Sequence, residues 1–222
     1  MSAPVLTIDG PSGVGKGTVA RVIAQQLGWN LLDSGAIYRA FALAVESRSV
    51  DITNEPALVK IATHLDLAFK TQANSELVSV YLDGQDVSKE LRLEATGEMA
   101  SKIASIGVVR SALLKRQQGF AILPGLVADG RDMGTVVFKE AAFKVYLTAD
   151  SEERANRRLK QLQAQGHEGI MSQILAEVEA RDARDSSRKH APLKPAKDAL
   201  IIDTTELSLI EVIAQVSELV KA

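Results

Sequence analysis

The chain has 222 residues, of which 46% are hydrophobic and 24% are charged; these proportions are typical of a soluble globular protein and exclude a disordered chain. The net charge of −2 and the aromatic content of 4% argue against a nucleic acid partner. The absence of cysteine excludes a disulfide scaffold, a zinc–thiolate site, an iron–sulfur cluster and a cysteine nucleophile. No apolar stretch approaches the roughly 20 residues that span a bilayer. No secretory signal is visible either, so we expect a cytoplasmic protein without a membrane partner.

Five short apolar runs, each followed by a polar or glycine-rich turn, are predicted to be the strands of one parallel sheet. The runs are residues 4–8, 29–32, 126–128, 143–147 and 200–202. Apolar residues at helical spacing follow the first two runs, and Gly28 marks the end of the first predicted helix. A last amphipathic helix is predicted from Leu209 to Val220. The alternation of strands and helices predicts a doubly wound α/β fold.

Residues 65–90 interrupt this alternation. Residues 65–69 and 78–82 each alternate between apolar and polar side chains, and the turn-like residues 71–75 lie between them, which predicts a hairpin. More than ninety residues separate the second and third predicted strands of the sheet, which is more than a crossover helix needs. We therefore expect an inserted subdomain in this part of the chain. A polar, glycine-bearing break at residues 165–169 is a candidate for a mobile tip between two helices.

The segment between the first predicted strand and the first predicted helix matches the phosphate-binding pattern G-x-x-x-x-G-K. In such a loop, backbone N–H groups and the start of the helix surround the phosphates, and the lysine supplies a positive charge. An ordinary glycine-rich turn is the alternative, but the strand, the spacing, the lysine and the helix together favour a phosphate loop. The predicted ATP-binding residues are Gly10, Pro11, Ser12, Gly13, Val14, Gly15, Lys16, Gly17 and Thr18.

One position departs from the usual phosphate loop. A serine or threonine that binds Mg²⁺ normally follows the lysine, but here Gly17 follows it and Thr18 comes next. This G-K-G-T variant resembles that of nucleoside monophosphate kinases, and the base-reading N-K-x-D motif of GTPases is absent from the sequence. We expect Mg²⁺ to be held mainly through water, with Thr18 and Asp129 as the candidate residues.

Further polar clusters follow the predicted strands, where ligands of open parallel sheets bind. Residues 33–39 form one cluster, which on its own predicts only a common turn. Residues 129–134 form another, in which two carboxylates flank Arg131 directly after an apolar run, and this arrangement favours function. Arginines repeat at helical spacing in two later segments, residues 154–158 and 181–188, where phosphoryl transfer would need positive charge. The arginines before the tip at 165–169 predict a lid that closes over a nucleotide.

Five motifs together carry a resemblance to a known family. They are IDGPSGVGKGT at 8–18, LLDSGAIYRA at 31–40, LVADGRDMGTVVF at 126–138, SEERANRR at 151–158 and ARDARDSSRKHAPL at 180–193. The sequence resembles the bacterial cytidylate (CMP) kinases. The resemblance implies one adenylate-kinase-like P-loop kinase domain over residues 1–222, with a five-stranded parallel sheet flanked by helices. Its parts would be a core (about 1–34, 106–153 and 185–222), a CMP-binding insert (about 35–105) and a short lid (about 154–170).

The resemblance also implies an activity. The family transfers a phosphoryl group from MgATP to CMP or dCMP, as a monomer. The residues that match its nucleoside-binding positions are Ser34, Arg110 and Asp132 for the cytosine, and Ser101, Arg181 and Asp185 for the ribose. Those that match its positions for the acceptor phosphate are Arg39, Arg131 and Arg188. The predicted catalytic residues are Lys16, Arg131, Arg157 and Arg188.

Two other functions remain open at this point. The chain could be another small-molecule P-loop kinase, acting on AMP, UMP or shikimate, although residues 129–134 argue against it. It could also be a regulatory protein that binds ATP without transferring a phosphoryl group, although the density of arginines argues against that.

Overall fold

The computed structural model describes residues 3–71, 78–164, 166 and 168–221. The chain divides into two compact units. One unit comprises Met1–Asp33 and Gln118–Ala222, and the other comprises Ser34–Gln117. The second unit contains the predicted insert of residues 35–105 and extends beyond it into the helix that follows.

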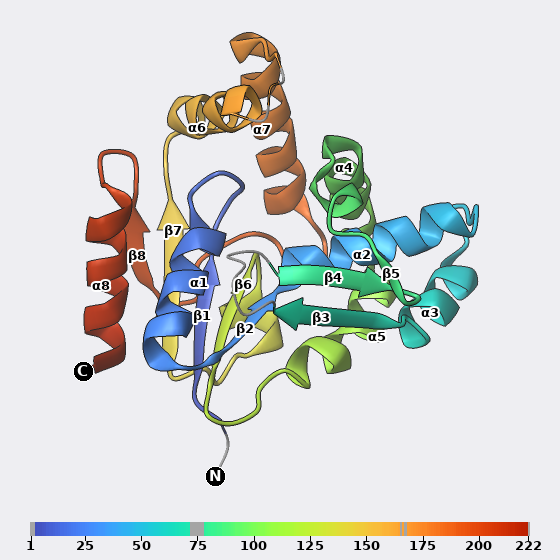
Figure 1. Ribbon diagram of the computed structural model, residues 1–222, viewed down its shortest axis with the longest axis horizontal. Helices are drawn as coiled ribbons and strands as arrows, with labels where there is room; N and C mark the ends of the chain where they lie inside the picture. Colours follow the sequence, from blue (N-terminus) through green and yellow to red (C-terminus); the bar gives the residue numbers. More distant parts are fainter. Residues whose placement is uncertain (1–2, 72–77, 165, 167, 222) are drawn as a thin grey trace. The chain divides into compact units, whose positions relative to one another are not determined.

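The first unit is built on a five-stranded parallel sheet, as predicted (Figure 1). Its strands are β1 (Val5–Asp9), β2 (Asn30–Asp33), β6 (Leu126–Gly130), β7 (Phe143–Thr148) and β8 (Leu200–Asp203). Their order is β2-β6-β1-β7-β8, with β1 in the centre. In the register, Asp33 on β2 lies opposite Asp129 on β6, and Asp9 on β1 lies opposite Gly130. The carboxyl ends of three neighbouring strands therefore lie at the same edge of the sheet.

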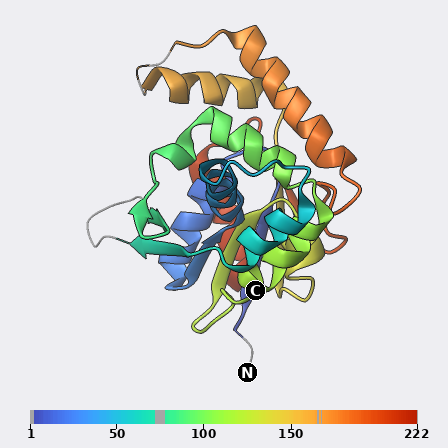
Figure 2. The same cartoon turned by 90° about the vertical axis from the view of Figure 1, so that its right-hand side faces the viewer.

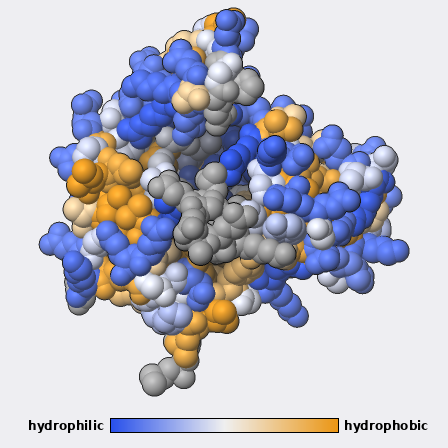
Figure 3. Space-filling view, in the orientation of Figure 1, coloured by the Kyte–Doolittle hydropathy of each residue, from blue (hydrophilic) through white to orange (hydrophobic). Residues whose placement is uncertain are grey.

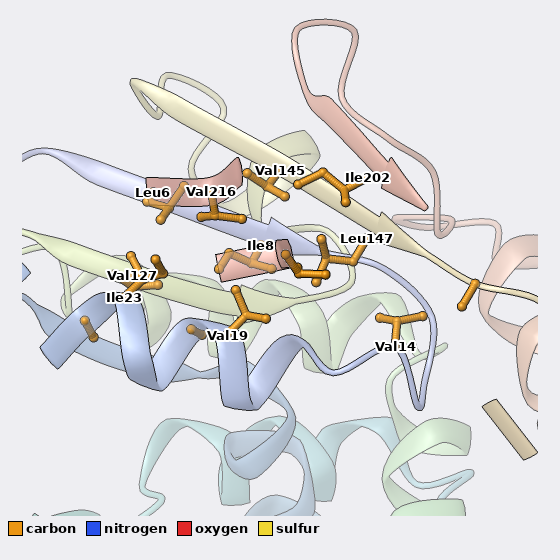
Figure 4. Close-up of a cluster of buried hydrophobic side chains, with 14 residues drawn as sticks. Leu6, Ile8, Val14, Val19, Ile23, Val127, Val145, Leu147, Ile202 and Val216 are labelled. Carbon is orange, nitrogen blue, oxygen red and sulfur yellow. The ribbon is translucent and has the colours of Figure 1, made fainter. Parts of the chain in front are cut away.

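Helices α1 and α8 cover one face of this sheet. The helices of this unit are α1 (Lys16–Leu27), α6 (Ser151–Ala164), α7 (Met171–Ser187) and α8 (Leu209–Lys221), with a short helical segment η2 (Met133–Val137). Leu6 and Ile8 project from β1 into a core that Val19 of α1 and Val216 of α8 complete (Figure 4). Because side chains alternate along a strand, Thr7 and Asp9 lie on the opposite face. The predicted helix stop at Gly28 is confirmed, with φ of 64° and its N–H bonded back to Ala24 and Gln25.

The second unit combines helices with a small antiparallel sheet (Figure 2). Its elements are α2 (Ser34–Ser47), α3 (Glu55–Thr63), β3 (Leu67–Thr71), β4 (Val78–Leu82), β5 (Gln85–Asp86), η1 (Glu90–Arg92), α4 (Glu94–Ile103) and α5 (Gly107–Gln118). The predicted hairpin is confirmed as β3 and β4, although residues 72–75 of its turn lie outside the described residues. The short strand β5 was not predicted. Ala40, Val80 and Leu91 join the helices and the sheet in one buried cluster.

The surface of the first unit exposes apolar side chains along one edge. Leu200 and Ile201 on the edge strand β8, and Leu209 and Ile210 at the start of α8, are all exposed. A hydrophobic patch, bordered by hydrophilic residues, lies on the side of the molecule where β8 and α8 lie (Figure 3). Among the described residues, no helix combines the length and the apolar character needed to cross a bilayer.

Candidate functional site

The phosphate loop connects β1 to α1, as the sequence predicts. Gly10 and Gly13 have φ angles of 149° and 83°, which side-chain-bearing residues rarely adopt. A side chain at Gly10 would collide with the backbone of β7, and one at Gly13 would make a tight contact with α6. A Cβ atom at Gly10 would lie 2.1 Å from the carbonyl oxygen of Leu147 on β7, and one at Gly13 would lie 3.1 Å from the Cβ atom of Arg154 on α6. The loop is therefore shaped by close contact with β7 and α6.

Lys16 is the first residue of α1, and its side chain turns back into the loop. Its Nζ atom donates a hydrogen bond of 2.6 Å to the carbonyl oxygen of Pro11. Burial lowers the pKa of the Lys16 ammonium group, and the positive charge of Arg131 lowers it further. Negatively charged phosphate groups would stabilise the ammonium form, so an anion bound at this loop would raise the pKa again.

Asp129 is the penultimate residue of β6 and lies beside the phosphate loop. Burial raises the pKa of its carboxyl group, whereas the neighbouring Lys16 lowers it. A Cβ atom at Gly17 would lie 3.3 Å from Oδ2 of Asp129, a tight contact, so the glycine allows α1 to lie close to this carboxylate. The exposed Thr18 follows in the same turn of α1.

These residues suit a cation that is held mainly by water and phosphate. Among the described residues, no group of three or more His, Cys, Asp or Glu side chains is arranged to hold a metal ion by itself. Mg²⁺ is often held by one or two carboxylates together with water and substrate phosphates, and it does not need a cage of protein ligands. The carboxylate of Asp129, next to the phosphate loop, fits that kind of site.

Asp9 fixes the backbone after β6 and was not predicted as a site residue. Its carboxylate accepts hydrogen bonds of 2.8 Å from the backbone N–H groups of Met133 and Gly134. Asp132, which precedes these two residues, is buried. Burial raises the pKa of Asp9 to about 6, although the two backbone hydrogen bonds lower it. The only signal in the sequence was an acidic residue at the end of an otherwise apolar run.

The titration of Asp9 predicts a measurable dependence of stability on pH. Because the pKa of Asp9 is about 6 in the folded protein and 3.8 for an unperturbed aspartate, the folded state binds this proton more tightly. The stabilisation from protonated Asp9 is full below pH 3.8 and is lost as the pH rises through 6. Relative to Asp9→Asn, the free energy of unfolding of the wild type should therefore fall by about 2.4 kcal/mol between about pH 4 and pH 7.

Urea unfolding of both proteins across this pH range measures the difference. Asp51→Asn is the matched control, because hydrogen bonds from Thr53 lower the pKa of the exposed Asp51. The corresponding difference for Asp51 should therefore change with pH in the opposite direction. A difference between wild type and Asp9→Asn that stays constant across the same pH range would contradict the assignment.

Three of the predicted acceptor-site residues form one network around a buried carboxylate. Asp185 on α7 accepts a hydrogen bond of 3.0 Å from Nε of Arg131 and another from Nη2 of Arg188. Burial raises the pKa of Asp185, but the charges of Arg131 and Arg188 outweigh this effect and hold it below its usual value. The structure thus brings Arg131, which follows β6, close to Arg188, which follows α7. The carboxylate of Asp185 orients both guanidinium groups. Arg181 precedes Asp185 by about one turn of the same helix.

Two of the arginines in the first half of α6 make different contacts. Arg154 is buried and donates to the carbonyl oxygens of Ala149 and Ser12, and to the carboxylate of Asp182 on α7. Arg157 pairs with Glu153 and donates to the hydroxyl and carbonyl oxygens of Thr204, just after β8. Of the predicted tip at 165–169, residues 165 and 167 lie outside the described residues.

The remaining predicted residues belong to the unit Ser34–Gln117. Ser34 starts α2, and its hydroxyl donates a hydrogen bond of 2.7 Å to the side chain of the buried Gln117. Arg39 donates to the carbonyl oxygens of Leu91 and Leu93, at 2.7 and 3.3 Å.

Arg110 and Ser101 lie on the helices that follow. Arg110 donates to the carbonyl oxygen of Ala104, and its guanidinium carbon lies 5.6 Å from the ring centre of Tyr38. Ser101 is buried on α4. Gln117 and Tyr38, which contact predicted residues of this unit, were not among the predicted binding residues.

Comparison with known proteins identifies the family. The sequence matches the family model described as "Cytidylate kinase" over residues 6–222. The chain is 55% identical over 213 residues to the cytidylate kinase of Photobacterium profundum, with 96% of this chain and 92% of the relative covered. It is 53% identical over 219 residues to the cytidylate kinase of Vibrio vulnificus (strain CMCP6), with coverage of 99% and 96%.

A third relative is equally similar. The chain is 54% identical over 214 residues to the cytidylate kinase of Pseudomonas putida, with 96% of this chain and 94% of the relative covered. A solved shikimate kinase from Bacteroides thetaiotaomicron is similar at a TM-score of 0.45 and 11% identity, over 99% of each chain, which is too low to bear on function. The resemblance noted in the sequence is thus confirmed, and the chain belongs to the cytidylate kinase family.

Proposed function

We propose that the protein catalyses the reversible transfer of the γ-phosphoryl group of MgATP to CMP and dCMP, which yields ADP with CDP or dCDP. Membership of the cytidylate kinase family supports this activity. The observation that carries it is the pairing of Arg131 and Arg188 on the buried Asp185, in the same unit as the phosphate loop. The protein would act as a monomer in the cytoplasm, in pyrimidine nucleotide metabolism.

On the donor side, residues 10–18 bind the phosphates of ATP. Their backbone N–H groups surround the phosphates, and Lys16 exchanges the carbonyl oxygen of Pro11 for a phosphate oxygen. Asp129 and Thr18 would hold Mg²⁺, mainly through water. When bound, this ion neutralises negative charge on the donor phosphates.

On the acceptor side, Asp132 accepts a hydrogen bond from the exocyclic amine of cytosine, while Arg110 donates to its ring acceptors and Ser34 completes the contacts with the base. Ser101, Arg181 and Asp185 bind the ribose. Arg39, Arg131 and Arg188 bind the phosphate, since a guanidinium group matches two phosphate oxygens at once. We also propose that the insert of about residues 35–105 contributes to CMP binding and that residues 154–170 form the lid.

The transfer itself needs little acid–base chemistry. An oxygen of the CMP phosphate is already negatively charged and attacks the γ-phosphorus of ATP. A new P–O bond forms while the bond between the γ-phosphorus and the bridging oxygen breaks, and ADP leaves with that electron pair. Lys16, Arg131, Arg157 and Arg188 are proposed to neutralise the charge that moves during this step, so that positioning and electrostatics carry the catalysis.

An acceptor panel tests the proposal. ADP formation is measured with ATP, Mg²⁺ and each of CMP, dCMP, UMP, AMP and shikimate. We expect the highest specificity constants for CMP and dCMP. A higher value for UMP, AMP or shikimate would favour a different small-molecule kinase, and ATP binding without ADP formation on any acceptor would favour a regulatory protein. Either result would overturn the proposed activity.

A further inference from the structure

We propose that Arg154 is a positioning residue of the ATP site. Its guanidinium group orients the peptide bond between Ser12 and Gly13 in the phosphate loop, and Asp182 on α7 holds the guanidinium group in place. The inference rests on the proposed function, because it assigns to Arg154 a part in ATP binding. Arg154 is the first residue of the proposed lid, and the role inferred here differs from one in which the arginine itself contacts the nucleotide.

Each of the three guanidinium nitrogens of Arg154 donates a hydrogen bond to a different group. Nε donates to the carbonyl oxygen of Ala149 at 3.0 Å, Nη1 donates to that of Ser12 at 3.1 Å, and Nη2 donates to Oδ2 of Asp182 at 2.5 Å. Only 4% of the residue is exposed. A buried guanidinium group with three acceptors around it is fixed in position, and a lysine could not reach the same three groups with the same geometry.

The contact with Ser12 determines where the next N–H group points. A peptide bond is planar and trans, so its carbonyl oxygen and its N–H group point in opposite directions. The carbonyl oxygen of Ser12 faces Arg154, and the N–H group of Gly13 therefore points away from it. In a phosphate loop, such N–H groups are the donors to the phosphates. By holding the carbonyl group, Arg154 keeps this donor oriented before ATP arrives.

The packing around Gly13 supports the same role. A Cβ atom at this position would lie 3.1 Å from Cβ and 3.4 Å from the carbonyl oxygen of Arg154. The loop thus lies directly against the first turn of α6, and the absence of a side chain permits the contact. Any shift of Arg154 would be transmitted to the loop backbone, because nothing flexible lies between them.

Asp182 is the group that fixes Arg154. Its Oδ2 atom accepts from Arg154, while its Oδ1 atom is buried and has no hydrogen-bond partner among the described residues. A carboxylate in such surroundings depends on its cation, so the two side chains stabilise each other. Removal of the charge on Asp182 should therefore release the guanidinium group of Arg154. Asp182 acts on the phosphate loop only through this arginine.

Arg154→Lys and Asp182→Asn are the variants that test the proposal. The dissociation constant of MgATP is measured by calorimetry, together with the KM for ATP, the KM for CMP and the thermal unfolding of each variant. We expect each substitution to weaken ATP binding about tenfold, which corresponds to about 1.4 kcal/mol, and to raise the KM for ATP far more than the KM for CMP. The double variant should bind ATP no more weakly than the worse single variant, because both act through one peptide bond.

Arg48 and Asp83 provide a matched control. They form an Arg–Asp pair at 2.7 Å in the other unit, with side chains that are 41% and 47% exposed. Arg48→Lys and Asp83→Asn should leave the affinity for ATP unchanged. This comparison separates an effect on the phosphate loop from the general loss of an arginine–carboxylate pair.

Three outcomes would overturn the inference, and they are distinguishable. Tighter ATP binding by Asp182→Asn would mean that Arg154 leaves Asp182 to contact the nucleotide directly. Unchanged ATP affinity in folded Arg154→Lys and Asp182→Asn proteins would mean that the pair is only structural. Failure of the wild type to bind ATP, or to release ADP with any acceptor, would overturn the proposed function and this inference with it.

Discussion

Replacement of Lys16 with alanine is expected to lower the rate of phosphoryl transfer by at least about a hundredfold while the protein remains folded. The side chain of Lys16 is buried, and its ammonium group carries positive charge to the place where donor phosphates would bind. Its ammonium group donates to Pro11 in the same loop, so the hydrogen bond that alanine removes is local. Burial lowers the pKa of this group, which means that the folded protein gains little stability from the charged form.

The measurement is ADP formation with saturating CMP, combined with thermal unfolding of the same preparation. Lys60→Ala, which removes an exposed lysine from α3, should leave turnover unchanged. If the Lys16→Ala protein were folded and kept near-normal turnover, the phosphate-loop assignment would be wrong.

Replacement of Asp132 with alanine is expected to reduce the specificity constant for CMP by roughly ten- to two-hundredfold. Asp132 is 3% exposed, and Asp9 fixes the backbone of the two residues that follow it. A charge-assisted hydrogen bond from the cytosine amine to this buried carboxylate would contribute about 1.5–3 kcal/mol. Uracil presents an oxygen in place of the amine, so the carboxylate would repel it. The variant should therefore also show a smaller preference for CMP over UMP.

The measurement is the specificity constant for CMP and for UMP at saturating ATP, in the wild type and in Asp132→Ala. It tests whether Asp132 recognises the base. Asp129→Ala is the comparison variant, because its carboxylate lies beside Gly17 in the phosphate loop and should affect both acceptors equally. Equal losses for CMP and UMP in Asp132→Ala would rule out a role for Asp132 in reading the base.

The strands, the phosphate loop and the hairpin could be predicted because their signals are local. Apolar runs, glycines and alternation each involve residues that are close together in the sequence. The contacts that shape the site are not local. Asp9 binds Met133, which is 124 residues further along the chain, and Arg154 binds Ser12, which is 142 residues away. Nothing near Arg154 in the sequence distinguishes it from Arg157, and only the fold shows that the two have different partners.

The site residues of the second unit show the same limit. Ser34 and Arg39 could be matched by their motif. Their hydrogen-bond partners, Gln117 and Leu91, lie in segments whose sequence predicts only an ordinary helix or turn. A buried glutamine within an amphipathic pattern has no signal of its own. Its hydrogen bond with Ser34 is apparent only in the folded unit, where the start of α2 meets the end of α5.

The hydrogen bond between Ser34 and Gln117 has a consequence for how such an enzyme could arise. These are the first and last residues of the second unit, so its two ends meet at a distance of 2.7 Å between side chains. Because the two ends of this unit lie together, it is inserted into the chain of the first unit much as a short turn would be. The entropic cost of closing a loop grows only slowly with its length, so a long insert costs little more than a short one. Modules of this kind can be exchanged or enlarged during evolution without disturbing the surrounding sheet. A kinase core could in this way acquire a new acceptor while the chemistry at its phosphate loop is preserved.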